Sequence, residues 1–143
     1  MSFQKIPLQI KKQNLYENLN LYQLIEFSKI NKETKSAIEP LIKKIKKNLF
    51  LTNYYLLYEN LFHNTHRSVL NDIYKSYGNK KLFLDFLYKY IKLRAKNKAY
   101  TEMHIIELEK KFRLCNNIQL YNMFIEFTES QKIKNLYRSV PTF

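Results

Sequence analysis

A single glycine, Gly78, stands in a chain of 143 residues, and only three prolines accompany it. The turns of β-hairpins and β-sandwiches need residues that adopt a positive φ or have φ preset, and glycine and proline supply most of them. A chain without this turn chemistry is a poor candidate for an all-β fold. The sequence therefore predicts an all-α protein.

The chain is long enough to build a hydrophobic core. A domain of this size buries roughly 70% of the surface that its unfolded chain exposes. Hydrophobic residues make up 45% of the chain and aromatic residues 15%. We expect a compact bundle of about six helices in a single domain over residues 14–143. Residues 1–13 are expected to form an extended basic arm, because Pro7 interrupts any regular helix there; a loosely packed terminus is the alternative.

Capping residues and apolar spacing predict the first helices. Asn14 is the expected N-cap of a helix that reaches about residue 30. Ser36 and Glu39 form a capping-box pattern, so a second helix is expected to begin near residue 37. Residues 49–62 are apolar on nearly all sides, which indicates either a buried third helix or a continuation of the second.

The C-terminal half shows clearer boundaries. Thr65 is the expected cap of a short helix that ends at Gly78 in the left-handed conformation. Asn79 is the expected cap of the next helix, residues 80–96. Thr101 is expected to cap a helix to about residue 115, and one last helix is expected over residues 118–137. Residues 79–140 are thus a possible three-helix sub-unit.

Cysteine usage and hydropathy bear on the compartment. Cys115 is the only cysteine, so no internal disulfide forms, which favours a reducing compartment such as the cytosol, nucleus or mitochondrial matrix. Charged residues interrupt every apolar stretch well short of about 18 residues, so no transmembrane helix is expected. The N-terminal residues lack the features of a secretory signal or a transit peptide. The mitochondrion is the expected location, reached without a cleaved presequence.

The net charge of +13 indicates attraction to polyanions. Only four of the 25 basic residues are arginine, and this lysine bias is typical of an AT-rich genome, so local clusters carry more weight than the total. We expect two clusters to contact RNA or an acidic protein partner, although each also fits a merely solvated helix face. The clusters are Lys43, Lys44, Lys46 and Lys47 in the first, and Lys89, Lys92, Arg94 and Lys96 in the second.

No group of residues predicts a catalytic centre, a metal site or a cofactor. Glu59, His63 and His66 have helical spacing, but the polar residues between the histidines indicate a helix break, so surface histidines are the favoured interpretation. His104 and Cys115 are eleven residues apart and cannot meet within one helix. A phosphate-binding loop needs several glycines. A non-enzymatic protein is expected.

Residues 82–140 resemble the LYR-motif family of small mitochondrial helical proteins. The residues that carry the resemblance are Leu87, Tyr88 and Lys89 in one helix and Phe112 and Arg113 near the end of the next. Lys92 and Arg94 follow the motif as basic residues. The resemblance implies a three-helix bundle that binds an acyl carrier protein. It also implies an adaptor or a subunit of a respiratory complex, of iron–sulfur assembly or of mitochondrial ribosome assembly.

Two functions fit these observations. The leading expectation is a structural subunit of a larger organellar assembly, in concrete terms an RNA-contacting protein of a mitochondrial ribosome. The alternative is a LYR-type adaptor or an accessory subunit of a respiratory complex that binds an acyl carrier protein. A helix-turn-helix DNA-binding protein is disfavoured, because the helix after Gly78 begins with apolar residues that belong in a core.

Overall fold

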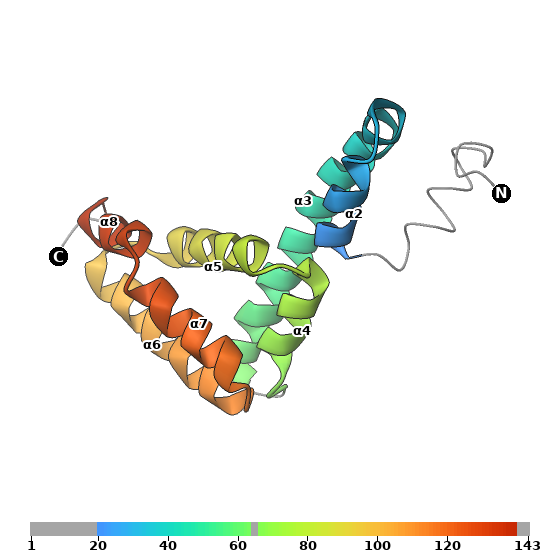
Figure 1. Cartoon of the computed structure of the whole chain (residues 1–143). Helices are drawn as coiled ribbons and strands as arrows, with labels where there is room; N and C mark the ends of the chain where they lie inside the picture. Colours follow the sequence, from blue (N-terminus) through green and yellow to red (C-terminus); the bar gives the residue numbers. More distant parts are fainter. Residues whose placement is uncertain (1–19, 64–65, 140–143) are drawn as a thin grey trace.

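The computed structural model describes residues 20–63 and 66–139, which form seven helices and no strand (Figure 1). The all-α fold and the compact bundle are confirmed, whereas the predicted arm over residues 1–13 lies outside the described residues. The helices, in chain order, are α2 (Leu21–Ser28), α3 (Lys32–His63), α4 (Val69–Tyr77), α5 (Lys80–Arg94), α6 (Lys98–Leu114), α7 (Ile118–Thr128) and α8 (Gln131–Ser139).

Helix α3 is the longest of the described helices. Figure 1 shows α2 lying along its first half and α4 along its second half. Helix α5 crosses away from α4, and α6 and α7 run side by side before α8 closes the far end. Buried side chains from all seven helices join one hydrophobic cluster. None of the described helices combines the length and the apolar character needed to cross a bilayer.

The predicted start of the second helix is wrong. Asn31, not Ser36, provides the cap, because its side-chain oxygen accepts the Thr34 amide at 2.8 Å. Ser36 and Pro40 consequently lie inside α3. The apolar stretch over residues 49–62 continues this helix as one of the two predicted alternatives, but its outer side is exposed, with Tyr55 60% accessible.

The boundary at Gly78 is confirmed. Gly78 ends α4 with a φ of 75° and donates its amide to the Tyr74 carbonyl. A Cβ at this position would collide with the side chain of Asn20, the N-cap of α2. Asn79 then caps α5, as predicted, by accepting the Lys81 and Leu82 amides. The glycine is therefore required by its backbone conformation and by the close approach of α2.

Two predicted boundaries in the C-terminal half are wrong. Asn97 caps α6 by accepting the Tyr100 amide at 2.9 Å, and Thr101 is instead a buried interior residue whose hydroxyl donates to the Asn97 carbonyl. The helix expected over residues 118–137 is two helices, so residues 79–140 hold four helices rather than three. Thr128 and Ser130 donate their hydroxyls to backbone carbonyls at the break, a local bonding pattern that competes with helix continuation.

Aromatic rings connect α5 to both sides of the bundle. The ring of Phe86 in α5 meets the ring of Phe50 in α3 edge-on, with centroids 5.8 Å apart. The ring centroids of Tyr90 and Tyr54 are 5.1 Å apart. On the other side Phe83 contacts Phe112 of α6, which in turn stacks on Phe124 of α7 with centroids 4.4 Å apart. These contacts fix where α5 crosses α3, and the crossing decides which surface side chains of the two helices come together.

Candidate functional site

Three predicted lysines of α3 line one side of a groove. Lys43, Lys46 and Lys47 are followed one turn later by Phe50 and Leu51, which also line it. Residues three and four apart share a face of a helix, so these side chains point in one direction. An adjoining side of this part of α3 carries Ile38 and Ile42, which are buried in the core. Burial of those two isoleucines therefore holds the lysine face outward.

Helix α5 supplies the other side. Lys89, Lys92 and Leu93 line the groove, while Phe86 and Tyr90 of the same helix are buried against α3. The Lys89 ammonium lies 5.8 Å from the centre of the Phe50 ring, within reach of a cation–π contact. The aromatic contacts that seat α5 on α3 thus bring the two predicted basic clusters together.

The α3–α5 groove, lined by Lys43, Lys46, Lys47, Phe50, Leu51, Lys89, Lys92 and Leu93, has a volume of about 690 Å³. Its lining contains five lysines and no acidic residue. None of the ion pairs among the described residues includes any of these lysines. The groove therefore combines lysines with three apolar side chains, Phe50, Leu51 and Leu93, which we call its floor. A bound anion would relieve the repulsion between the lysines.

Three residues of the predicted clusters lie elsewhere. Lys44 and Lys96 are exposed but do not line the groove. Arg94 turns away from it: its guanidinium carbon lies 4.4 Å from the centre of the Tyr58 ring. Five of the eight predicted basic residues thus converge on one surface, namely Lys43, Lys46, Lys47, Lys89 and Lys92.

Arg94 lines a separate, smaller cavity of about 120 Å³ with Tyr58, Tyr90, His104 and Glu107 among its walls. The Nε atom of Arg94 and the Nδ1 atom of His104 are buried there without a hydrogen-bond partner among the described residues. Nδ1 lies 3.7 Å from a Glu107 carboxylate oxygen, beyond hydrogen-bond distance. Burial lowers the pKa of His104, which opposes protonation of the ring.

The residues of the LYR resemblance face different parts of the molecule. Leu87 is buried in the core, and Lys89 faces α3. Tyr88 is half-buried, with the Lys132 ammonium of α8 4.3 Å from its ring centre. Phe112 is part of the aromatic core, whereas Arg113 is exposed and pairs with Glu109 at 2.8 Å. These positions leave the family resemblance a prediction.

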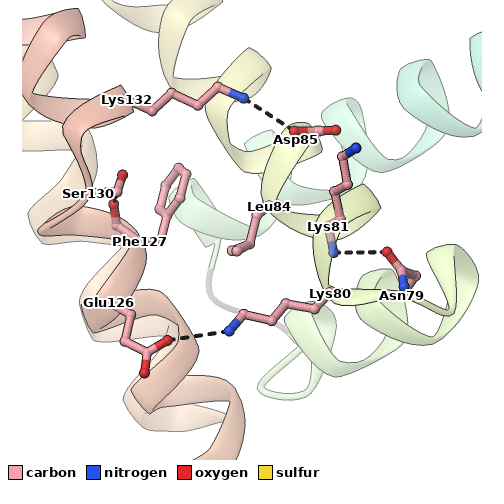
Figure 2. Close-up of a pocket in the computed structure, with 9 residues that line it drawn as sticks. All are labelled: Asn79, Lys80, Lys81, Leu84, Asp85, Glu126, Phe127, Ser130 and Lys132. Carbon is pink, nitrogen blue, oxygen red and sulfur yellow. Dashed lines mark hydrogen bonds and ion pairs between the residues drawn. The ribbon is translucent and has the colours of Figure 1, made fainter.

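A second cleft, of about 580 Å³, lies between α5 and the α7–α8 connection (Figure 2). Leu84 and Phe127 provide its apolar part. Two of its three lysines form ion pairs across the cleft, which Figure 2 shows: Lys80 binds Glu126 at 3.3 Å and Lys132 binds Asp85 at 3.2 Å. Because these lysines are paired with carboxylates, this cleft attracts a polyanion less than the α3–α5 groove does.

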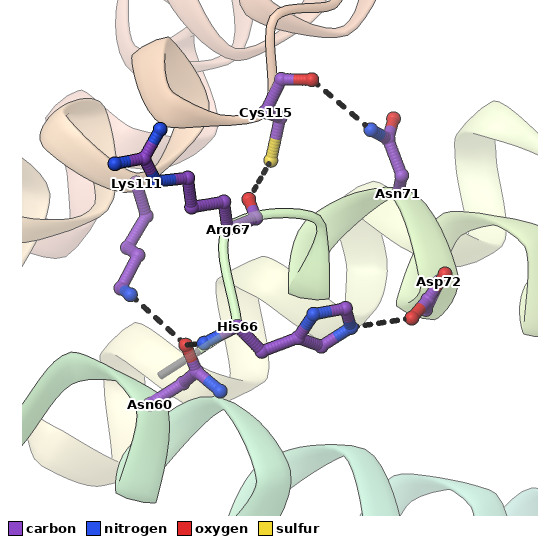
Figure 3. A network of polar contacts seen from close by, with 7 residues as sticks. All are labelled: Asn60, His66, Arg67, Asn71, Asp72, Lys111 and Cys115. Carbon is purple, nitrogen blue, oxygen red and sulfur yellow. Dashed lines mark hydrogen bonds and ion pairs between the residues drawn. The ribbon is translucent and has the colours of Figure 1, made fainter. Parts of the chain in front are cut away.

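Lys111 and Cys115 take part in a network of polar contacts (Figure 3). Lys111 is only 4% exposed and donates to Asn60 Oδ1, which also accepts the His66 amide. Cys115 donates its thiol to the Arg67 carbonyl, and its own carbonyl accepts from Asn71. Burial lowers the pKa of Lys111 and raises the pKa of Cys115. The network ties the α3–α4 connection to α6.

Metal ligands do not assemble in the part of the chain that the structure describes, where no group of three or more histidine, cysteine or acidic side chains comes together. His66 instead pairs with Asp72 at 2.6 Å, one turn into α4. The side chain of His63 lies outside the described residues.

The apolar floor of the groove was missed by sequence reasoning. Phe50 follows Lys43 by seven residues and Leu93 follows Lys89 by four, so helical spacing alone places each on the face of its neighbouring lysines. That signal becomes meaningful only once α3 and α5 are known to meet.

Comparison with known proteins gives no relative from which to transfer a function. No protein-family model, curated protein sequence or solved structure matches the chain. A function can therefore be proposed only from the groove and its chemistry.

Proposed function

We propose that this protein is a non-enzymatic structural subunit of a larger assembly and that it contacts RNA through the α3–α5 groove. The observation that carries the proposal is the convergence of five lysines from two helices on one surface that has no acidic residue in its lining. A mitochondrial ribosome is the assembly that a small, basic, helical protein of this kind fits most concretely.

Counterion release makes the proposal quantitative. Each phosphate that a lysine neutralises on a single strand lowers the logarithm of the binding constant by about 0.7 per decade of salt, and by about 0.9 on a duplex. If all five groove lysines contact phosphates, binding to a single strand falls by about 3.5 decades per decade of salt. Removing three of them should reduce that slope to about 1.4.

The test compares two triple variants that lose the same charge. The groove variant combines Lys43→Gln, Lys46→Gln and Lys47→Gln, and the control combines Lys44→Gln, Lys96→Gln and Lys98→Gln, all exposed residues outside the groove lining. Fluorescence anisotropy with labelled RNA across a salt series should show weaker binding and a smaller slope for the groove variant alone. An equal loss of RNA affinity in both variants would show that only the net charge matters. It would refute the groove as the RNA contact.

An acidic protein partner is the second candidate. The apolar floor favours it, because a LYR-type adaptor that binds an acyl carrier protein would need a surface with both lysines and exposed apolar side chains. In this case, Lys89→Glu should abolish co-purification with the carrier. Lys96→Glu should leave it intact, because Lys96 is exposed and lies outside the groove lining.

A further inference from the structure

We infer that the α3–α5 groove takes unpaired RNA, with bases on its apolar floor and phosphates on its lysine sides, and that it discriminates against duplex. This inference rests on the proposed function and names the form of RNA that the same groove accepts. It goes beyond charge, because the lysines alone would attract either form.

The floor is the feature that separates the two forms. Leu93 is 64% exposed and Leu51 is 44% exposed, and both line the groove together with its five lysines. A duplex presents phosphates and sugars on its outside and keeps its base faces stacked inside. A duplex laid across the groove would cover these leucines without giving them an apolar partner. An unpaired strand can turn its bases onto the floor, where the leucines cover apolar base surface, while its backbone follows the lysines as it does in the basic grooves of single-strand binding proteins.

An aromatic ring extends the floor along α3. Tyr55 lies one turn beyond Leu51 on the same side of the helix and is 60% exposed. Its ring packs edge-on against the ring of Tyr54 with centroids 5.5 Å apart, and this contact helps to hold it in place. A base that leaves the groove at this end comes near an exposed aromatic side chain, the type of residue on which unpaired bases stack.

The basic side chains point to sequence tolerance. All five are lysines, which carry a compact charge on a flexible stem and lack the planar fork with which arginine reads guanine or grips a phosphate. The groove thus holds a backbone without selecting a base order. Any preference among single strands should follow stacking strength.

The test uses the full chain and two RNAs of about 12 nucleotides, a length within the range of single-strand sites. One is a single-stranded oligouridylate and the other a blunt duplex, each labelled for fluorescence anisotropy. A second variant, the leucine variant, combines Leu51→Ser and Leu93→Ser. Its matched control combines Ile106→Ser and Ile118→Ser, exposed residues of α6 and α7 outside the groove lining. Circular dichroism checks that each variant keeps its helices.

We expect tighter binding to the single strand than to the duplex. The leucine variant should lose roughly tenfold in affinity for the single strand, because it removes apolar contact area, and it should keep the affinity of the wild type for the duplex. The control should change neither affinity. Equal or tighter duplex binding that still depends on the groove lysines would overturn the inference and leave the proposed function standing. If neither RNA shows salt-dependent binding, both the inference and the proposed function are refuted. Tighter, competing binding of a glutamate-rich amphipathic peptide would assign the groove to an acidic protein instead.

Discussion

Lys89 of α5 holds its ammonium group 5.8 Å from the centre of the Phe50 ring of α3, and the same ring meets Phe86 of α5 edge-on at 5.8 Å. One side chain thus forms part of the groove floor and of the joint between the two helices. Phe50→Ala should lower the free energy of unfolding by about 2 kcal/mol, less than for a fully buried ring because Phe50 is half-exposed. Urea denaturation measures the loss.

A double-mutant cycle isolates the contact with the lysine. Phe50→Leu and Lys89→Met, alone and together, should give a coupling energy of about 0.5 kcal/mol, the size of an exposed cation–π contact. Strictly additive effects would show that the ammonium and the ring do not interact.

Gly78→Ala should destabilise the protein by about 2–3 kcal/mol, because alanine is strained at a φ of 75° and its Cβ collides with Asn20. The double variant Asn20→Ser, Gly78→Ala should recover part of that loss, since serine is smaller and still caps α2. Thermal and urea unfolding provide the comparison. A Gly78→Ala protein as stable as the wild type would refute both parts of the explanation.

The corrected helix starts can be tested with one pair of substitutions. Asn97→Ala should cost about 1 kcal/mol, because it removes the cap of α6 and leaves the Tyr100 amide without its acceptor. Ser36→Ala should be neutral or slightly stabilising, since Ser36 is an exposed interior residue of α3 and alanine is the better helix former. The opposite order of effects would restore the capping box at Ser36.

His104 predicts a dependence of stability on pH. Its pKa in the folded protein is lowered by burial, despite the opposing effect of Glu107, while the charge of Arg94 in the same cavity acts in the direction of burial. The unfolded chain therefore binds more protons between the folded pKa and the ordinary value of 6.5. The free energy of unfolding should fall as the pH drops through this window, and the loss is complete below the folded pKa.

Urea titrations between about pH 7 and pH 5 measure this slope. His104→Gln should flatten it, because glutamine does not titrate. An unchanged slope in that variant would assign the pH dependence to other groups.

Helix ends that depend on one residue and its neighbours could be predicted from the sequence, whereas the choice between competing caps could not. Gly78 and Asn79 were predicted correctly because the left-handed conformation and the cap each depend on one residue and its immediate neighbours. Asn31 and Asn97 were missed because a competing serine or threonine a few residues later also makes an acceptable cap. The choice between two such caps is made by packing, as the complete burial of Thr101 shows.

The candidate site was predictable only in part. The lysine clusters were visible as runs in the sequence, but the predicted clusters also included Lys44, Arg94 and Lys96, which lie outside the groove lining. The groove exists because α5 crosses α3, and that crossing depends on rings such as Phe50 and Phe86 that are 36 positions apart in the chain. Periodicity within one helix does not report a contact over that separation.

Pro40 divides α3 in a way that hydrogen exchange would reveal. Proline has no amide, so the ladder of backbone hydrogen bonds lacks the bond from residue 40 to the Ser36 carbonyl. On the N-terminal side of this gap, α2 and the first turns of α3 form a hairpin, and on the other side α3 carries the groove. We expect the amides of residues 21–39 to exchange with deuterium as one cooperative unit, faster than those around Leu57. The hairpin can then open and close while the lysine-bearing face stays assembled.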